Sequence, residues 1–84
     1  MEKLSERVLN SIEKIKPDIR MRLDVPNFVT NGVLDSMDVI NIIVAFEDDF
    51  GIEVDPVDVV HDNFATIEKM TAFVEKYLSK DGKA

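Results

Sequence analysis

The chain has 84 residues, a formal net charge of −7 and no cysteine. This length fits one domain, and the missing cysteines exclude disulfides, a thiolate nucleophile and a zinc–thiolate site. We predict a single domain over residues 1–84, with an ordered core at about 2–79 and a flexible polar tail at 80–84. Because no apolar run resembles a signal peptide or a membrane span, we expect a cytoplasmic protein without stable membrane insertion.

The negative charge is concentrated in one third of the chain. Nine of the 17 acidic residues lie between Asp35 and Asp62, a segment without lysine or arginine. Such a surface repels phosphate, so we expect no nucleic-acid partner. It favours a partner protein with a basic surface, although acidic runs are more often only a solvated surface.

Two amphipathic helices are predicted at the ends of the chain. The first runs from Glu2 to about Ile15 and is stopped by Pro17. The last runs from about Thr66, a good N-cap, to Leu78.

The segment 17–34 is harder to interpret. Apolar and polar residues alternate from Ile19 to Val25, which by pattern alone predicts a strand. The only candidate partner is the short Gly51–Val54, and a two-stranded ribbon is marginal. We therefore predict an extended loop fixed to a helical bundle by Ile19, Leu23 and Phe28.

The central helix carries two apolar faces. At 100° per residue, one sector forms the predicted core face: Val39, Ile42, Ile43, Phe46 and Phe50. A second sector contains Met37, Ile40 and Val44, with Glu47 and Asp48 at its edges. The second sector is either covered by a neighbouring segment or forms an exposed apolar strip that a partner binds.

Ser36 has no evident structural role at the start of this helix. Asp35 is a good N-cap, and Asp38 three residues later completes an approximate capping box. A catalytic Ser36 would need a base, but His61 is the only histidine and no G-x-S-x-G motif surrounds the serine. Calcium binding is also not supported, since "EDDFGIEVD" lacks the spacing of an EF-hand loop. We predict that the protein is not an enzyme and that it acts by being modified or bound.

The stretch "GVLDSMD", Gly32–Asp38, resembles the attachment motif of acyl and peptidyl carrier proteins. The resemblance extends from Leu4 to Leu78 and includes "FEDDFGIEV" and "DNFATIEKM". It implies an all-α fold: a four-helix bundle of acyl-carrier type with a long first loop and a short third helix at about Pro56–His61.

The resemblance also implies a cofactor and partners. A phosphopantetheinyl transferase would attach 4'-phosphopantetheine to Ser36, with Asp35 as a second cofactor-binding residue, and the arm's thiol would carry an acyl group as a thioester. The helix N-terminus favours the phosphate, while Asp35 and Asp38 oppose it. Further partners would be acyl ligase or synthase enzymes with basic surfaces, meeting a monomeric carrier. The predicted partner-binding residues are Met37, Asp38, Ile40, Asn41, Val44, Glu47, Asp48 and Val54.

The cargo stays open between several interpretations. Acyl intermediates of fatty acid, lipid or polyketide metabolism are one, and an aminoacyl (for example D-alanyl) or peptidyl cargo is another. Asn41, where fatty-acid carriers usually have an acid, and "VVHDNFATIEKM" are more typical of carriers for amino acids or specialised pathways. A further alternative is an unmodified helical adaptor that binds basic partners through its acidic face.

Overall fold

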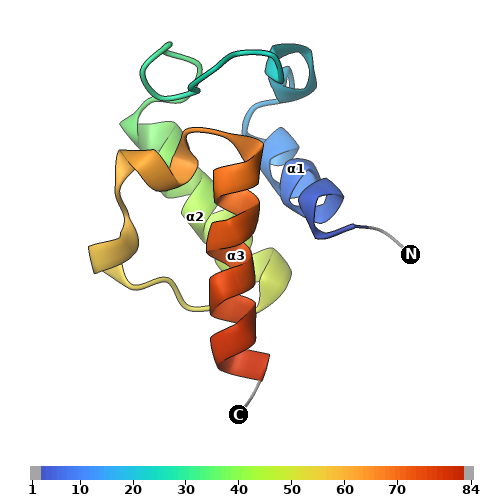
Figure 1. Ribbon diagram of the computed structural model, residues 1–84, viewed down its shortest axis with the longest axis vertical. Coiled ribbons are helices and arrows are strands. Elements are labelled where there is room, and N and C mark those ends of the chain that lie inside the picture. Colours follow the sequence, from blue (N-terminus) through green and yellow to red (C-terminus); the bar gives the residue numbers. More distant parts are fainter. Residues whose placement is uncertain (1–2, 83–84) are drawn as a thin grey trace.

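The computed structural model describes the backbone of residues 3–82 and the side chains of residues 3–79. Three α-helices span this region: α1 (Leu4–Ile15), α2 (Ser36–Phe50) and α3 (Ile67–Gly82). Short 3-10 helices at Ile19–Arg22, Pro56–Asp58 and His61–Phe64 lie between them, and no strand occurs in the described chain. Figure 1 shows α2 crossing behind α3, with α1 beside the upper part of α3. The all-α prediction is confirmed.

The predicted short third α-helix is not present in the described chain. Its segment instead forms the 3-10 helix Pro56–Asp58, which is followed by a second 3-10 helix. The Pro56 carbonyl, which an α-helix would bond to the amide of Val60, accepts from Val59 N at 3.1 Å, and Val60 N donates to the Asp58 carbonyl at 2.9 Å instead. The β-branched Val57, Val59 and Val60 also disfavour a helix. The bundle therefore has three α-helices, not four.

Two of the three α-helices have clear sequence-encoded ends. Gly51 closes α2 in the left-handed conformation, with a φ of 64°, which glycine adopts without strain. Thr66 caps α3, since its Oγ1 accepts a hydrogen bond from Lys69 N at 3.0 Å. α3 continues to Gly82, beyond the predicted end at Leu78.

Two sequence predictions concern the chain ends. The predicted helix start at Glu2 lies outside the described residues, as do residues 83–84 of the polar tail. The flexibility of 80–84 stays a prediction.

The core lies where the three helices face one another. Its side chains come from one stripe of each helix and from the segments that connect them. The buried apolar residues include Val8, Leu9 and Ile12 of α1; Val39, Ile42, Phe46 and Phe50 of α2; and Met70, Phe73, Val74 and Tyr77 of α3. Ile43, predicted on the core face of α2, is only half-buried. Burial of these side chains from water is the main stabilising contribution.

The long loop between α1 and α2 is fixed by two of its three predicted anchors. Ile19 and Phe28 are fully buried, and the amide of Phe28 donates to the carbonyl of Ala65 at 2.7 Å. Leu23, however, is 47% exposed. The prediction that Leu23 anchors the loop is wrong, because the chain turns this side chain to the rim of a hollow between α1 and α3.

Candidate functional site

Ser36 is the first residue of α2 and is exposed to solvent. The predicted capping box is present: Asp38 N donates to Asp35 Oδ1 at 2.9 Å, and Asp35 N donates to Asp38 Oδ2 at 3.2 Å. Asp35 and Asp38 thus satisfy each other's backbone, as helix ends require. The Ser36 hydroxyl makes no hydrogen bond to any described residue. It is an accessible hydroxyl with no structural task.

The turn before Ser36 fixes the position of this hydroxyl. The Phe28 carbonyl accepts from the amides of Val33 and Leu34, at 2.8 and 3.0 Å. Gly32 allows the chain to reverse here, with a φ of 77°. Leu34 is buried on one side of Ser36 and Val39 on the other. Ser36 is therefore held at the surface between two core anchors.

The charge next to Ser36 is partly balanced. Asp38, which is half-buried, pairs with Lys16 of the first loop at 3.3 Å between Nζ and Oδ2. The start of α2 also presents its positive dipole end and unbonded amides. An anion attached to Ser36 is opposed mainly by the carboxylate of Asp35.

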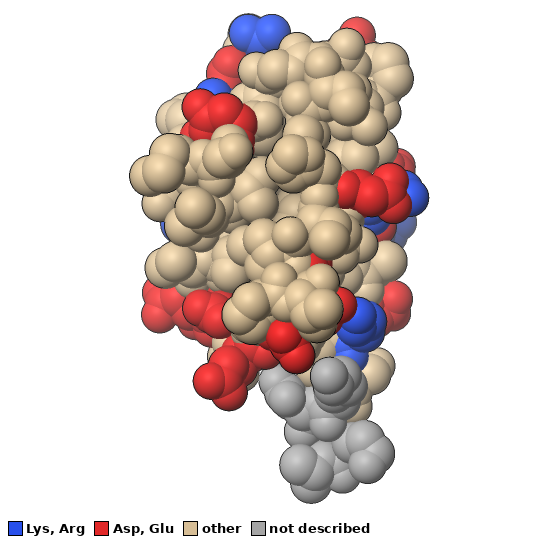
Figure 2. Space-filling view, turned by 90° about the vertical axis from the view of Figure 1, so that its left-hand side faces the viewer, with Lys and Arg blue, Asp and Glu red and all other residues tan. Residues whose placement is uncertain are grey.

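The second apolar sector of α2 is exposed. Met37, Ile40 and Val44 are 63%, 50% and 58% accessible, so the alternative in which a neighbouring segment covers them is wrong. Figure 2 views the side of the molecule where the start of α2 and the loop after it lie in Figure 1. Much of this face is uncharged, and acidic side chains border it. Such a surface suits a protein partner.

Comparison with known proteins identifies the family of the chain. The family described as "Phosphopantetheine attachment site" matches residues 7–74. The chain belongs to the phosphopantetheine-dependent carrier proteins. A D-alanyl carrier protein from Abiotrophia defectiva is 31% identical over 75 residues, which are 87% of this chain and 94% of that protein. No solved structure matches.

The family determines the chemistry of the carrier. Its members carry 4'-phosphopantetheine covalently on a serine and are themselves not catalytic. When bound, the group supplies a thiol at the end of a long arm. The exposed, unbonded hydroxyl of Ser36 fits this attachment. In the described part of the carrier, no helix is long and apolar enough to cross a bilayer, and no cluster of metal-ligating side chains occurs.

The other predicted partner-binding residues of the carrier differ in exposure. Asn41 and Asp48 are exposed on α2. Glu47 is half-buried, and its Oε2 accepts from the amide of Val54 at 2.9 Å. Val54 is itself half-buried against the core. Glu47 therefore fastens the loop after α2, a structural role that the sequence did not indicate.

Three valines that the sequence analysis missed extend the exposed apolar surface of the carrier. Val57, Val59 and Val60 are exposed in the loop between α2 and α3. Their only sequence signal is the apolar content of "PVDVV", which lies within the short helix predicted at about Pro56–His61.

Tyr77 of α3 holds this loop in place. Its hydroxyl accepts from Asp55 N at 3.0 Å and donates to the carboxylate of Asp58, which also pairs with Lys76 at 3.3 Å. Burial, and then the bond to Asp58, raises the pKa of Tyr77. The hydroxyl therefore stays protonated and able to donate.

The acidic segment is less free than its sequence suggests. Four of its carboxylates pair with lysines from other elements: Asp38–Lys16, Asp49–Lys14, Asp58–Lys76 and Asp62–Lys69. Hydrogen bonds from Lys14 and then Ser11 lower the pKa of Asp49. Among the described residues, Asp48 and Glu53 make no ion pair. Fewer carboxylates of this segment are therefore available to a basic partner than its sequence alone suggests.

Proposed function

We propose that Ser36 carries the phosphopantetheine arm of this carrier. The observation that supports this most directly is the exposed Ser36 hydroxyl, which is not used by the Asp35–Asp38 capping box and hydrogen-bonds to no described residue. No basic side chain of the described chain hydrogen-bonds to this hydroxyl, so the transferase must supply the base that removes its proton. The chain's own contribution is to present the hydroxyl in a fixed, accessible place.

We further propose that partner enzymes dock on the exposed face of α2. Met37, Ile40 and Val44 form its apolar part, and Asp48 and Asn41 lie exposed beside them. A tethered thioester meets a docked enzyme at high effective concentration, so weak docking steered by charge is sufficient. The rate of arm attachment to an Ile40→Glu variant tests this, since an unchanged rate would remove the apolar part from the interface.

For the cargo we propose an aminoacyl group, with D-alanyl as the first candidate. Support comes from the similarity to a D-alanyl carrier protein over 94% of that protein's length. Asn41 is exposed and uncharged at a position where fatty-acid carriers usually have an acid. A fatty acyl or polyketide cargo, the other interpretation, has no comparable support.

Intact mass measurement tests attachment and cargo in turn. The protein is incubated with coenzyme A and a phosphopantetheinyl transferase, alongside Ser36→Ala and the matched control Ser79→Ala, which alters an exposed serine of α3. We expect one phosphopantetheine on the wild type and on Ser79→Ala, and none on Ser36→Ala. Ser36→Ala should unfold like the wild type, because an exposed first-turn serine contributes little packing.

The loaded protein then distinguishes the cargoes. It is offered D-alanine or octanoate, each with ATP and an adenylating ligase for that acid, and its mass is read again. A D-alanyl adduct with little octanoyl adduct supports the proposal, and the reverse overturns the cargo while leaving the attachment intact. No phosphopantetheine on the wild type, with a transferase that loads a control carrier, would favour the unmodified adaptor.

A further inference from the structure

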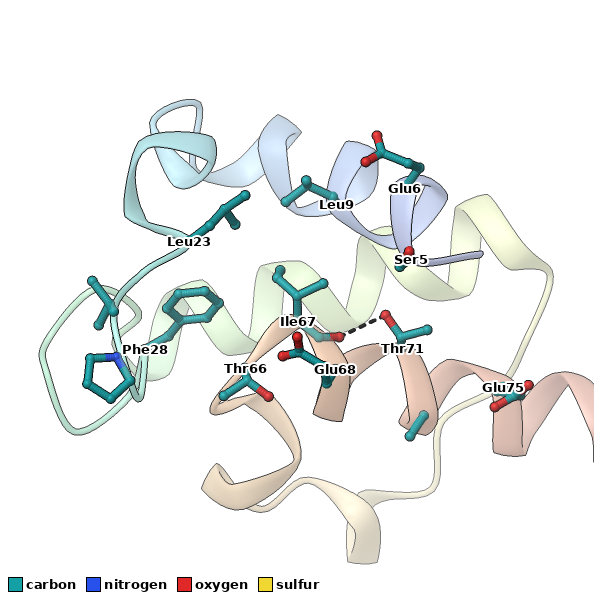
Figure 3. Close-up of a pocket in the computed structure, with 13 residues that line it drawn as sticks. Ser5, Glu6, Leu9, Leu23, Phe28, Thr66, Ile67, Glu68, Thr71 and Glu75 are labelled. Atoms are coloured by element: carbon teal, nitrogen blue, oxygen red, sulfur yellow. Dashed lines mark hydrogen bonds between the residues drawn. The ribbon is translucent and has the colours of Figure 1, made fainter. Parts of the chain in front are cut away.

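A hollow of about 700 Å³ lies between α1, the first loop and α3. Thirteen residues line it, and none belongs to α2. Figure 3 shows Leu9 of α1 on one side, Ile67 and Glu68 of α3 on the other, and Leu23 and Phe28 toward one end. The hollow is separate from Met37, Ile40 and Val44, and nothing in the proposed function uses it.

Small side chains explain why the two helices leave space here. Ser5 of α1 and Thr71 and Ala72 of α3 line the hollow, where larger residues would close it. The Thr71 hydroxyl donates to its own helix, to the Ile67 carbonyl at 2.7 Å, so it is already satisfied. The floor is apolar, because Leu9 and Phe28 are buried beneath the opening. An apolar side chain placed on this floor would bury apolar surface from water, which stabilises a complex.

The rim of the hollow carries negative charge only. Its charged residues are Glu6, Glu68 and Glu75, without lysine or arginine. Glu6 is already close to Arg20, at 3.6 Å. Glu68 and Glu75 make no ion pair with any side chain of residues 3–79.

The sequence of α3 explains why these two carboxylates do not pair with the lysines next to them. A Glu-Lys pair occurs twice, at Glu68-Lys69 and Glu75-Lys76, seven residues apart. This spacing places both glutamates on one face of the helix and both lysines on another. The lysines turn away and bind Asp62 and Asp58, at 3.0 and 3.3 Å. The lysine next to each glutamate is therefore engaged elsewhere.

We propose that this hollow docks a basic amphipathic helix of a partner protein. Two carboxylates two turns apart, about 10 Å, match two cationic side chains seven positions apart on such a helix. Apolar side chains three and four positions after the first cation would then lie over Leu9 and Phe28. A partner held here would leave Ser36 and the exposed face of α2 accessible to a second enzyme.

The test uses the unmodified full-length chain, so it does not depend on the proposed function. The probe is an acetylated, amidated 15-residue peptide of alanine and glutamine, with lysine at positions 4 and 11 and leucine at 7 and 8. It is titrated into isotope-labelled protein, and amide NMR shifts are followed. We expect shifts at Leu9, Leu23 and Thr71 and unchanged signals at Met37 and Ile40. Peptides with both leucines as alanine, or both lysines as glutamine, should bind more weakly.

Matched double variants distinguish specific binding in the hollow from general attraction to an acidic protein. Glu68→Gln/Glu75→Gln and Asp48→Asn/Glu53→Gln each remove two carboxylates that form no ion pair with a side chain of residues 3–79. We expect the first pair to weaken binding roughly fivefold and the second less than about twofold, given the strength of exposed ion pairs. Ala72→Leu, at an exposed position of the hollow, should fill it and weaken binding without unfolding the protein.

Three results would overturn the proposal. Equal weakening by both double variants would show attraction to net charge only. Unchanged binding of the peptide without leucines would show that the apolar floor is not used. Shifts at Leu9 and Leu23 that grow with protein concentration, without peptide, would make a second copy of the chain the occupant.

Discussion

The start of α2 and the loop after it lie on one side of the molecule, but different interactions hold them. At the start of α2, Asp35 and Asp38 bond each other's backbone across three residues. In the loop, Asp55 and Asp58 bond to Tyr77, 22 and 19 residues further along the chain. One region is fixed by local chemistry and the other by the docking of α3.

This difference suits the proposed roles of the two regions. Because a local cap forms with the helix itself, the first turn of α2, with Ser36, depends less on distant packing than the loop does. The loop with Val57, Val59 and Val60 depends on α3 instead. Such segments open at lower free energy than the core.

Tyr77→Phe tests whether Tyr77 of α3 holds the loop after α2. Of the variants considered, it should have the largest effect on stability. It removes the acceptor for Asp55 N and the donor to Asp58, while the ring keeps its packing against Phe73, 5.2 Å away between centroids. We expect a loss of about 1–3 kcal/mol in the free energy of unfolding. Amide hydrogen exchange should accelerate at 57–60 and stay unchanged at Asp38 and Val39.

Thr71→Val is the control for Tyr77→Phe. It removes an α3 hydroxyl whose bond is local, to Ile67 O, and should leave exchange in the loop unchanged. If Tyr77→Phe instead accelerated exchange equally in the loop and at the start of α2, the two regions would open together and the distinction would be lost.

Asp35→Ala tests whether the local cap holds the start of α2. Its expected effect on stability is smaller than that of Tyr77→Phe. It removes the side chain that accepts from Asp38 N, and losing an N-cap costs about 1 kcal/mol. Exchange should accelerate in the first turn of α2 only, and phosphopantetheine should still attach to Ser36. Urea denaturation and amide exchange measure both effects.

Asp35→Asn serves as the matched variant because it keeps an acceptor oxygen at the same place. We expect it to unfold close to the wild type. Equal losses for the alanine and asparagine variants would show that the charge of Asp35 near the helix dipole matters, and not the cap.

The same contrast explains which sequence predictions are confirmed. The Asp35–Asp38 box, the Thr66 cap and most of the α2 core face were predictable, because each follows from residues within a few positions of one another. The exposure of Met37, Ile40 and Val44 was only one of two alternatives, since periodicity shows an apolar face without showing what covers it.

The predictions that fail depend on contacts beyond one helical turn or on the exact backbone hydrogen-bond pattern. The helix predicted at about Pro56–His61 is only a 3-10 helix at Pro56–Asp58, where Val60 N donates to Asp58 O and not to Pro56 O, and Leu23 is turned outward where the first loop borders the hollow. Glu47 stays a predicted partner-binding residue, but the sequence did not indicate that its carboxylate also accepts from Val54 N, seven residues further along the chain. Periodicity does not show which of several carboxylates or carbonyls a backbone or side-chain donor at that separation will reach.

The smallest expected effect concerns Asp49, whose partners come from α1. Both its carboxylate oxygens lie 2.7 Å from Lys14 Nζ, and buried Ser11 also donates to it. These bonds lower its pKa below the 3.8 of an unfolded chain, so Asp49 stabilises the fold above that pH. The contribution is lost as pH falls through 3.8 toward the lowered value.

Asp49→Asn should therefore lower the free energy of unfolding by about 0.5 kcal/mol at pH 7, and the difference from wild type should shrink below about pH 4. Asp48→Asn, at the neighbouring exposed carboxylate without an ion pair to a described residue, should change stability little at either pH. Urea denaturation between pH 3 and 7 measures both. A gap for Asp49→Asn that stays constant with pH would mean that lost packing, and not the charge on Asp49, links α2 to α1.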